Sequence, residues 1–242
     1  MTPQSNPSRN TYRELLDGLL VLDRKDKSKV ELETVIPHFF RIQSLLRCTI
    51  EHVEGAVSEA RSGRILPAMA LTRSAFDHVV LASYLHKLPN GSEAAEWIVE
   101  KKLREFAENA MSAGATESAA ELFASLDSEG KPLEGVRTKT WKIIQVFEER
   151  KTLELLYYFL SQAVHPQAAF SQYVDLDETT GERRIRRKAL DQDSGGVEPF
   201  ICHILAIALL LDADVRNDYV MRERILVLIK EADFSPEINI QK

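Results

Sequence analysis

The fold is decided by two neighbouring stretches, residues 37–61, PHFFRIQSLLRCTIEHVEGAVSEAR, and residues 67–88, PAMALTRSAFDHVVLASYLHKL. In both, apolar side chains recur at steps of three to five residues and charged side chains fill the other faces, which is the pattern of an amphipathic helix. Ser62-Gly63 predicts the end of the first helix, and Pro67 predicts the restart. Because the link is so short, the two helices are expected to form a long antiparallel hairpin, roughly over 34–61 and 67–88.

The remainder of the chain also favours helices, separated by glycine, proline and asparagine signals. A small β-hairpin is expected near 172–188, where alternating residues flank a turn that contains Gly181. Ser92 is expected to cap the helix that follows the hairpin. The class is therefore all-α, a bundle of about eight to ten helices around the hairpin. The expected helices are 11–23, 92–112, 116–129, 139–149, 152–164 and 197–232, the last with a break near Asn217.

Three segments are predicted along the chain: an N-terminal tail and short helix over 1–33, a single helical domain over 34–232, and a tail over 233–242. The stretch from Arg24 to Lys29 reads as a loop within the first of them. The boundaries follow the loss of helical periodicity at each end.

Composition limits the function classes. The formal net charge of −6 in 242 residues argues against a surface that is basic throughout, as phosphate binding would favour. The two cysteines, Cys48 and Cys202, lie in apolar helical stretches and are expected to be buried free thiols. Residues 1–10 do not resemble a signal peptide, and the apolar run Phe200 to Leu211 is shorter than the roughly 20 residues of a membrane span. We expect a cytoplasmic protein of bacterial type that does not contact membranes.

Each arm of the predicted hairpin carries an arginine followed five residues later by a histidine. Arg47 precedes His52, and Arg73 precedes His78. Histidine can move a proton to or from a ribose 2′-OH near neutral pH, and arginine can hold the phosphate, so the pair could cleave RNA without a metal. A spacing of five places the two side chains on adjoining faces of a helix. Their convergence on one phosphate would need a second chain or a distorted helix.

This R-x4-H motif on a long helical hairpin resembles the HEPN superfamily. The resemblance implies a metal-independent endoribonuclease that acts as a dimer in defence or toxin–antitoxin systems. It assigns catalysis to Arg73 and His78, with Arg47 and His52 as the lesser alternative. The chain departs from the family pattern at the residue after each arginine, which is Ser74 or Cys48 here and is often Asn, Asp or His in the family.

A second resemblance covers more of the chain, about residues 35–215. Ala70-Leu-Thr-Arg-Ser-Ala-Phe-Asp77 and Leu160-Ser-Gln-Ala-Val-His-Pro166 resemble a large bacterial family of uncharacterised helical proteins with RS-x-x-E/D and S-x-x-V-H-P motifs. That resemblance implies a helical fold and no established activity.

Structural interpretations stand beside the catalytic ones. Arg73 and Asp77, like Arg47 and Glu51, have the i, i+4 spacing of helix-stabilising ion pairs. With His165, Arg73 and Asp77 could form a polar network that holds the bundle together. The alternative is an RNA- or nucleotide-phosphate site formed by Arg73, Asp77 and His165, with Arg47 and His52 as further binding residues. The other histidines, His38, His86 and His203, are expected to be structural.

The basic run after Gly181 has two interpretations. It guards an exposed strand edge against aggregation, or it contacts RNA or an acidic partner. Its cations are Arg183, Arg184, Arg186, Arg187 and Lys188. No histidine follows a glutamate by three residues, as a di-metal carboxylate bundle requires, and the sequence contains no phosphate-binding glycine loop. We therefore expect no metal and no cofactor.

The function that these patterns favour is a non-catalytic regulatory or interaction module, open to a protein partner, whose network of Arg73, Asp77 and His165 is structural. The resemblance to the HEPN superfamily implies that the protein is a homodimer. The alternative is a HEPN-like endoribonuclease that uses Arg73 and His78.

Overall fold

The computed structural model describes residues 9–25, 39–114, 121, 133–162, 164, 174–176, 179, 183–185 and 196–232. These residues are mostly helical, which confirms the predicted all-α class. Predictions for 1–8, 26–38, 165–173, 186–188 and 233–242, and for the helix expected over 116–129 apart from Glu121, lie outside them. The helices of the described ranges are α1 (Arg9–Lys25), α2 (Phe39–Arg61), α3 (Ile65–Lys87), α4 (Gly91–Ser112), α6 (Thr140–Ile144), α7 (Arg150–Gln162), α9 (Glu198–Arg216) and α10 (Tyr219–Glu231).

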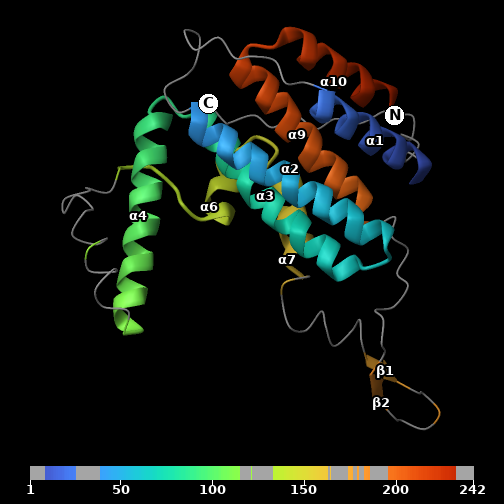
Figure 1. Ribbon diagram of the computed structural model, residues 1–242, viewed down its shortest axis with the longest axis horizontal. Helices are drawn as coiled ribbons and strands as arrows, with labels where there is room; N and C mark the ends of the chain where they lie inside the picture. Colours follow the sequence, from blue (N-terminus) through green and yellow to red (C-terminus); the bar gives the residue numbers. More distant parts are fainter. Residues whose placement is uncertain are drawn as a thin grey trace.

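Helices α2 and α3 run antiparallel, side by side, through the middle of the molecule (Figure 1). Gly63 ends α2 in the left-handed conformation, with φ at 73°. The N–H of Gly63 donates to the Ala60 carbonyl at 3.0 Å, and that of Arg64 donates to the Glu59 carbonyl at 2.9 Å, which completes a Schellman motif. The expected stop at Ser62-Gly63 is confirmed. The restart is earlier than Pro67, because α3 begins at Ile65 and proline is accepted within a first turn.

Helix α9 forms the layer above this pair and packs on both α2 and α3 (Figure 1). It is apolar nearly all round, and the run from Ile204 to Leu209 is buried, as expected of a helix inside a core. Asn217 ends it in the left-handed conformation, with φ at 55°. The Asp218 side chain then accepts a hydrogen bond from the Met221 N–H at 2.9 Å and caps α10. The predicted break near Asn217 is confirmed.

Helices α1 and α10 pack on α9 from the other side. Glu198 is only 3% exposed and pairs with Arg13 of α1, with 2.9 Å between Oε1 and Nε. The buried Cys202 thiol donates to the Tyr12 carbonyl at 3.2 Å, and burial raises the pKa of this thiol to about 12. Cys48, expected to be buried, is exposed, because it lies beside rather than on the face of α2 that carries Leu46 and Ile50. Helix α1 also extends to Lys25, so Arg24 and Lys25 are helical and not part of a loop.

The opposite side of the hairpin is covered by α4, α6 and α7, all packed on α3. Helix α4 begins at Gly91 after Asn90, without a side-chain cap, so the prediction that Ser92 caps it was wrong. Helix α6 stops at Ile144, although a helix was expected over 139–149. Its end tightens into i to i+3 hydrogen bonds, and the turn buries Phe147 completely before α7 starts at Arg150.

Within the described residues, α3 alone is long and apolar enough for a membrane span by length and composition. Half of its most apolar stretch is buried in the bundle. Contacts with α2, α4, α6, α7 and α9 account for that apolar character, because a helix surrounded by others has little face left for water.

A short antiparallel pair of strands, β1 (Val174–Leu176) and β2 (Arg183–Ile185), lies away from the helices in Figure 1. The register sets Val174 opposite Ile185 and Leu176 opposite Arg183.

Candidate functional site

The polar residues of the hairpin separate into three groups, the first of which is centred on Arg73 in α3. Its guanidinium forms an ion pair with Asp77, one turn along the same helix. Its Nε donates to the Ser161 hydroxyl of α7 at 3.2 Å, and its Cζ lies 4.2 Å from the centroid of the Tyr157 ring. The Arg73 side chain is only 12% exposed. Helices α3 and α7 therefore enclose this cation.

These contacts differ in strength. The ion pair contributes little, on the order of 0.2–0.5 kcal/mol, because the Asp77 side chain is 40% exposed and water screens it. The stacking of the guanidinium on Tyr157 is worth more, up to about 2 kcal/mol for a desolvated pair. The predicted pairing of Arg73 with Asp77 is confirmed, and the contacts to Tyr157 and Ser161 were not predicted. His165 lies outside the described residues.

Arg47 of α2 points to a different neighbour. Its Nη1 lies 3.4 Å from Oδ1 of Asp23 in α1, and its side chain is half exposed. The expected partner, Glu51, is replaced because α1 packs close enough to offer a carboxylate of its own. Since Arg47 faces α1 and Arg73 faces α7, the two arginines do not share a site.

The two histidines of the same motifs do come together. The rings of His52 in α2 and His78 in α3 have centroids 5.2 Å apart, with 46° between their planes. The Nδ1 of His52 lies 2.6 Å from the Cys48 carbonyl, and because a carbonyl oxygen only accepts, Nδ1 is the donor in this hydrogen bond. Nδ1 of His78 is buried and has no hydrogen-bond partner among the residues that the structure describes.

Burial lowers the pKa of His78, and the neighbouring His52 lowers it further, against a smaller opposing effect of Asp77. His78 is therefore neutral at pH 7. A neutral His78 imidazole can accept a proton and return it. A phosphate beside these histidines would need a cation, yet Arg73 is held by Tyr157 and Ser161, and the charge of the Asp77 carboxylate acts on His78.

The remaining predicted residues contribute less. Arg183 and Arg184 lie in β2, paired in register with Leu176 and Asp175 of β1, and Arg186, Arg187 and Lys188 lie outside the described residues. His203 is half-buried in α9, and desolvation lowers its pKa to about 4, so it is a neutral histidine within the bundle. Within the described ranges, no group of three or more histidine, cysteine or carboxylate side chains could hold a metal ion.

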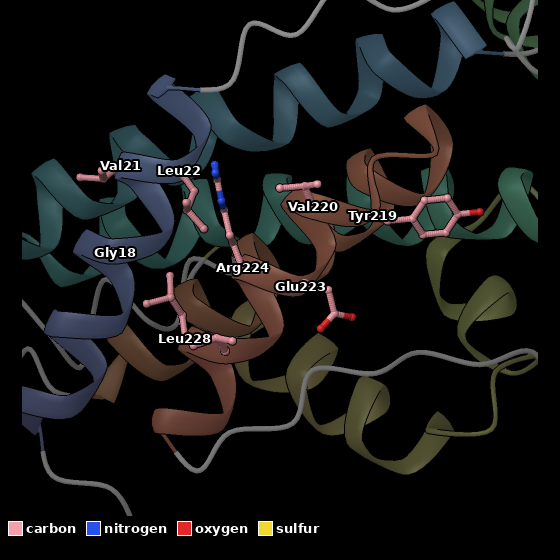
Figure 2. A pocket seen from close by; sticks show the side chains of 9 residues that line it. Gly18, Val21, Leu22, Tyr219, Val220, Glu223, Arg224 and Leu228 are labelled. Atoms are coloured by element: carbon pink, nitrogen blue, oxygen red, sulfur yellow. The ribbon is translucent and has the colours of Figure 1, made fainter.

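A groove with a volume of about 790 Å³ lies between α1 and α10 (Figure 2). This groove was not predicted from the sequence. Its walls are almost wholly apolar. The signal in the sequence was a second apolar stripe on α10, at Tyr219, Val220 and Val227, outside the buried stripe at Met221, Ile225 and Ile229. The lining residues are Gly18, Val21, Leu22, Tyr219, Val220, Glu223, Arg224, Val227 and Leu228.

The fold and these side chains define a class of protein, an all-helical bundle built on an antiparallel pair of long helices. On one side of this pair, the polar contacts of Arg73 join α3 to α7. Residues 39–182 match the model of a family of unknown function (DUF5677), and since the match spans more than half of the chain, the protein belongs to this family. Comparison with curated proteins and with solved structures gave no match. The matched region runs from α2 to just before β2. It includes Arg73 with its partners Asp77, Tyr157 and Ser161 (the Arg73 cluster), whereas the groove between α1 and α10 lies outside it.

Proposed function

We propose that this protein is a non-catalytic interaction module that binds a second copy of itself through the groove between α1 and α10. The observation that carries the proposal is the exposed apolar surface there: Val220 is 63% exposed, Val227 is 53% exposed and Val21 is 44% exposed. A helical surface of this kind is suited to hold an apolar helix of a partner.

The groove is part of a closely packed pair of helices and not a gap between loops. A Cβ atom on Gly18 of α1 would lie 3.3 Å from Cδ1 of Leu228, so the glycine allows α1 and α10 to approach. Leu22 and Leu228 line the hollow from the two helices (Figure 2). A firm base of this kind favours docking without a large rearrangement.

The charges of the groove favour a second copy as the occupant. Glu223 and Arg224 are adjacent on α10, both exposed, and neither makes an ion pair or hydrogen bond within the described part of the chain. Figure 2 shows their side chains pointing away from each other. In a twofold arrangement each surface meets its own copy, so the Arg224 of one protomer can pair with the Glu223 of the other while the valines pack together.

The test is the molar mass in solution. We expect the wild-type chain to be a dimer by light scattering and sedimentation, and Val227→Glu to be a folded monomer because it places a charge in the apolar contact. Val99→Glu on α4 is the matched control, since Val99 is 47% exposed and far from the groove in the fold, and it should remain a dimer. A monomeric wild type, or a dimeric Val227→Glu variant with unchanged affinity, contradicts the proposal.

A second candidate function is favoured by the contact between His52 and His78. In that case the protein is a HEPN-like, metal-independent endoribonuclease in which His78 moves the proton of the 2′-OH and Arg73 leaves Tyr157 to hold the phosphate. Cleavage of RNA by the purified protein in EDTA, abolished by His78→Ala with an unchanged melting temperature, supports this function. A wild-type protein that cuts no RNA and is not toxic to cells excludes it.

A further inference from the structure

A second pocket, between α4 and the segment that leads through α6, has the composition of a nucleotide site. We propose that it binds a nucleoside phosphate, free or as part of a single RNA strand, with the base stacked on a tryptophan and the phosphate held by the surrounding cations. The pocket measures about 590 Å³, within the range of about 300–1,000 Å³ that small-molecule sites occupy. The inference goes beyond the proposed self-association and does not depend on it.

Aromatic side chains form one part of this pocket. The chain contains two tryptophans, and both Trp97 and Trp141 line this pocket. Trp141 is 45% exposed, which is unusual for so large an apolar ring, and Trp97 is half-buried against the core. Exposed indole faces bind nucleobases without regard to sequence, because every base has a π-face to offer.

The charge of the pocket is the second observation. Four of its ten lining residues are cations and none is a carboxylate, in a chain whose net charge is −6. The cations are Lys101, Arg137, Lys139 and Lys142. Glu105, which does not line the pocket, pairs with Lys102 at 2.8 Å, and its pKa is lowered chiefly by that lysine, with smaller effects of Lys101 and Lys139. The lining of the pocket is therefore positively charged, as an anionic ligand requires.

Two of these cations already lie on the rings. Nζ of Lys101 is 5.1 Å from the centroid of Trp97, and Nζ of Lys142 is 5.4 Å from that of Trp141. Each indole therefore makes a cation–π contact with a lysine ammonium group. A ligand that joins an aromatic ring to a phosphate would satisfy both groups at once, whereas an acidic peptide would use the ammonium groups and leave the indoles exposed.

The wall of the pocket is held in place by the core. Tyr84 of α3, only 2% exposed, donates its hydroxyl proton to the Gly135 carbonyl at 3.4 Å and accepts from the Arg137 N–H at 3.1 Å. The Arg137 guanidinium donates to the Lys142 carbonyl at 2.7 Å. Gly135 has φ at 81°, which a side chain would disfavour. The segment from Gly135 to Lys142 is therefore anchored before any ligand arrives.

The test uses the tryptophans themselves, since both report on the pocket. We expect ATP, AMP and a short single-stranded oligo(A) RNA to quench the fluorescence of the full-length protein in a saturable way, when excitation is at the red edge where nucleobases do not absorb. Adenosine and inorganic phosphate, each with half of the required chemistry, should bind at least about tenfold more weakly. Tighter binding of the RNA than of AMP identifies a single strand as the ligand, and the reverse identifies a free nucleotide.

Two variants decide whether the signal comes from this pocket. Lys139→Glu combined with Lys142→Glu changes two exposed side chains and should weaken ATP binding by about tenfold or more, while Lys230→Glu at the end of α10 leaves it unchanged. Val227→Glu should also bind ATP normally, so failure here and failure of self-association are distinguishable. No saturable quenching by any nucleotide, equal binding of phosphate alone, or an undiminished affinity in the double variant overturns the inference.

Discussion

At the scale of single residues, Arg73 and Arg47 are a natural pair for comparison, because they occupy the same place in two copies of one motif. We expect Arg73→Ala to lower the free energy of unfolding by about 2 kcal/mol, since it removes a buried guanidinium from Tyr157 and Ser161. Arg47→Ala, from a half-exposed pair with Asp23, should cost less than about 0.5 kcal/mol. Urea unfolding followed by circular dichroism measures both.

The difference in unfolding free energy between the two alanine variants tests whether Arg73 holds α3 against α7. A loss of about 2 kcal/mol corresponds to roughly 4–8 °C in melting temperature for a chain of this size. Arg73→Lys should lie between wild type and alanine, because lysine keeps the charge but not the planar face that stacks on Tyr157. Equal, small effects at Arg73 and Arg47 would show that Arg73 does not brace α3 against α7.

At the scale of the elements, the turn between α9 and α10 depends on one backbone conformation. Asn217 has φ at 55°, which asparagine tolerates and a β-branched residue does not. We therefore expect Asn217→Val to lower the free energy of unfolding by about 1–2 kcal/mol. Asn217→Gly is the matched control and should be neutral or slightly stabilising, because glycine adopts this conformation freely. If both substitutions lower the free energy of unfolding by the same amount in urea, the left-handed conformation at residue 217 does not determine the stability of this turn.

The elements also show what the sequence can predict. Gly63 and Asn217 mark helix ends correctly because their left-handed conformations are local properties. The end of α6 at Ile144 was missed, since it depends on burying Phe147 against other helices. The same distinction holds at the candidate site. The pairing of Arg73 with Asp77 follows from spacing within one helix. The contact of His52 with His78, and the placement of Trp97 and Trp141 in the lining of one pocket, depend instead on how separate helices are rotated and packed.

At the scale of the whole molecule, the residues that match the family are not the same as the residues that form the hydrophobic core. The matched region, 39–182, ends before α9, yet α9 packs on both α2 and α3 and carries the most continuously buried stretch of the described chain. Helix α1 is tied to α9 by the buried Glu198. One hydrophobic cluster contains residues from α1, α2, α3, α4, α7, α9 and α10, so the layers share a single core.

A fragment of residues 39–182 should therefore fail to fold cooperatively, although it holds the hairpin and the Arg73 cluster. Without α9, the face of α2 and α3 that packs on it would be open to water, and an apolar surface of that extent favours association or collapse. We expect the fragment to bind a hydrophobic dye, to lack a sharp thermal transition and to regain one when residues 196–232 are supplied as a separate chain. The matched deletion, 174–185 removed from the full chain, should melt near wild type, because the strand pair lies away from the helices in Figure 1. A fragment that melts sharply on its own would mean that α9 is an accessory layer and that the core divides between the two parts of the chain.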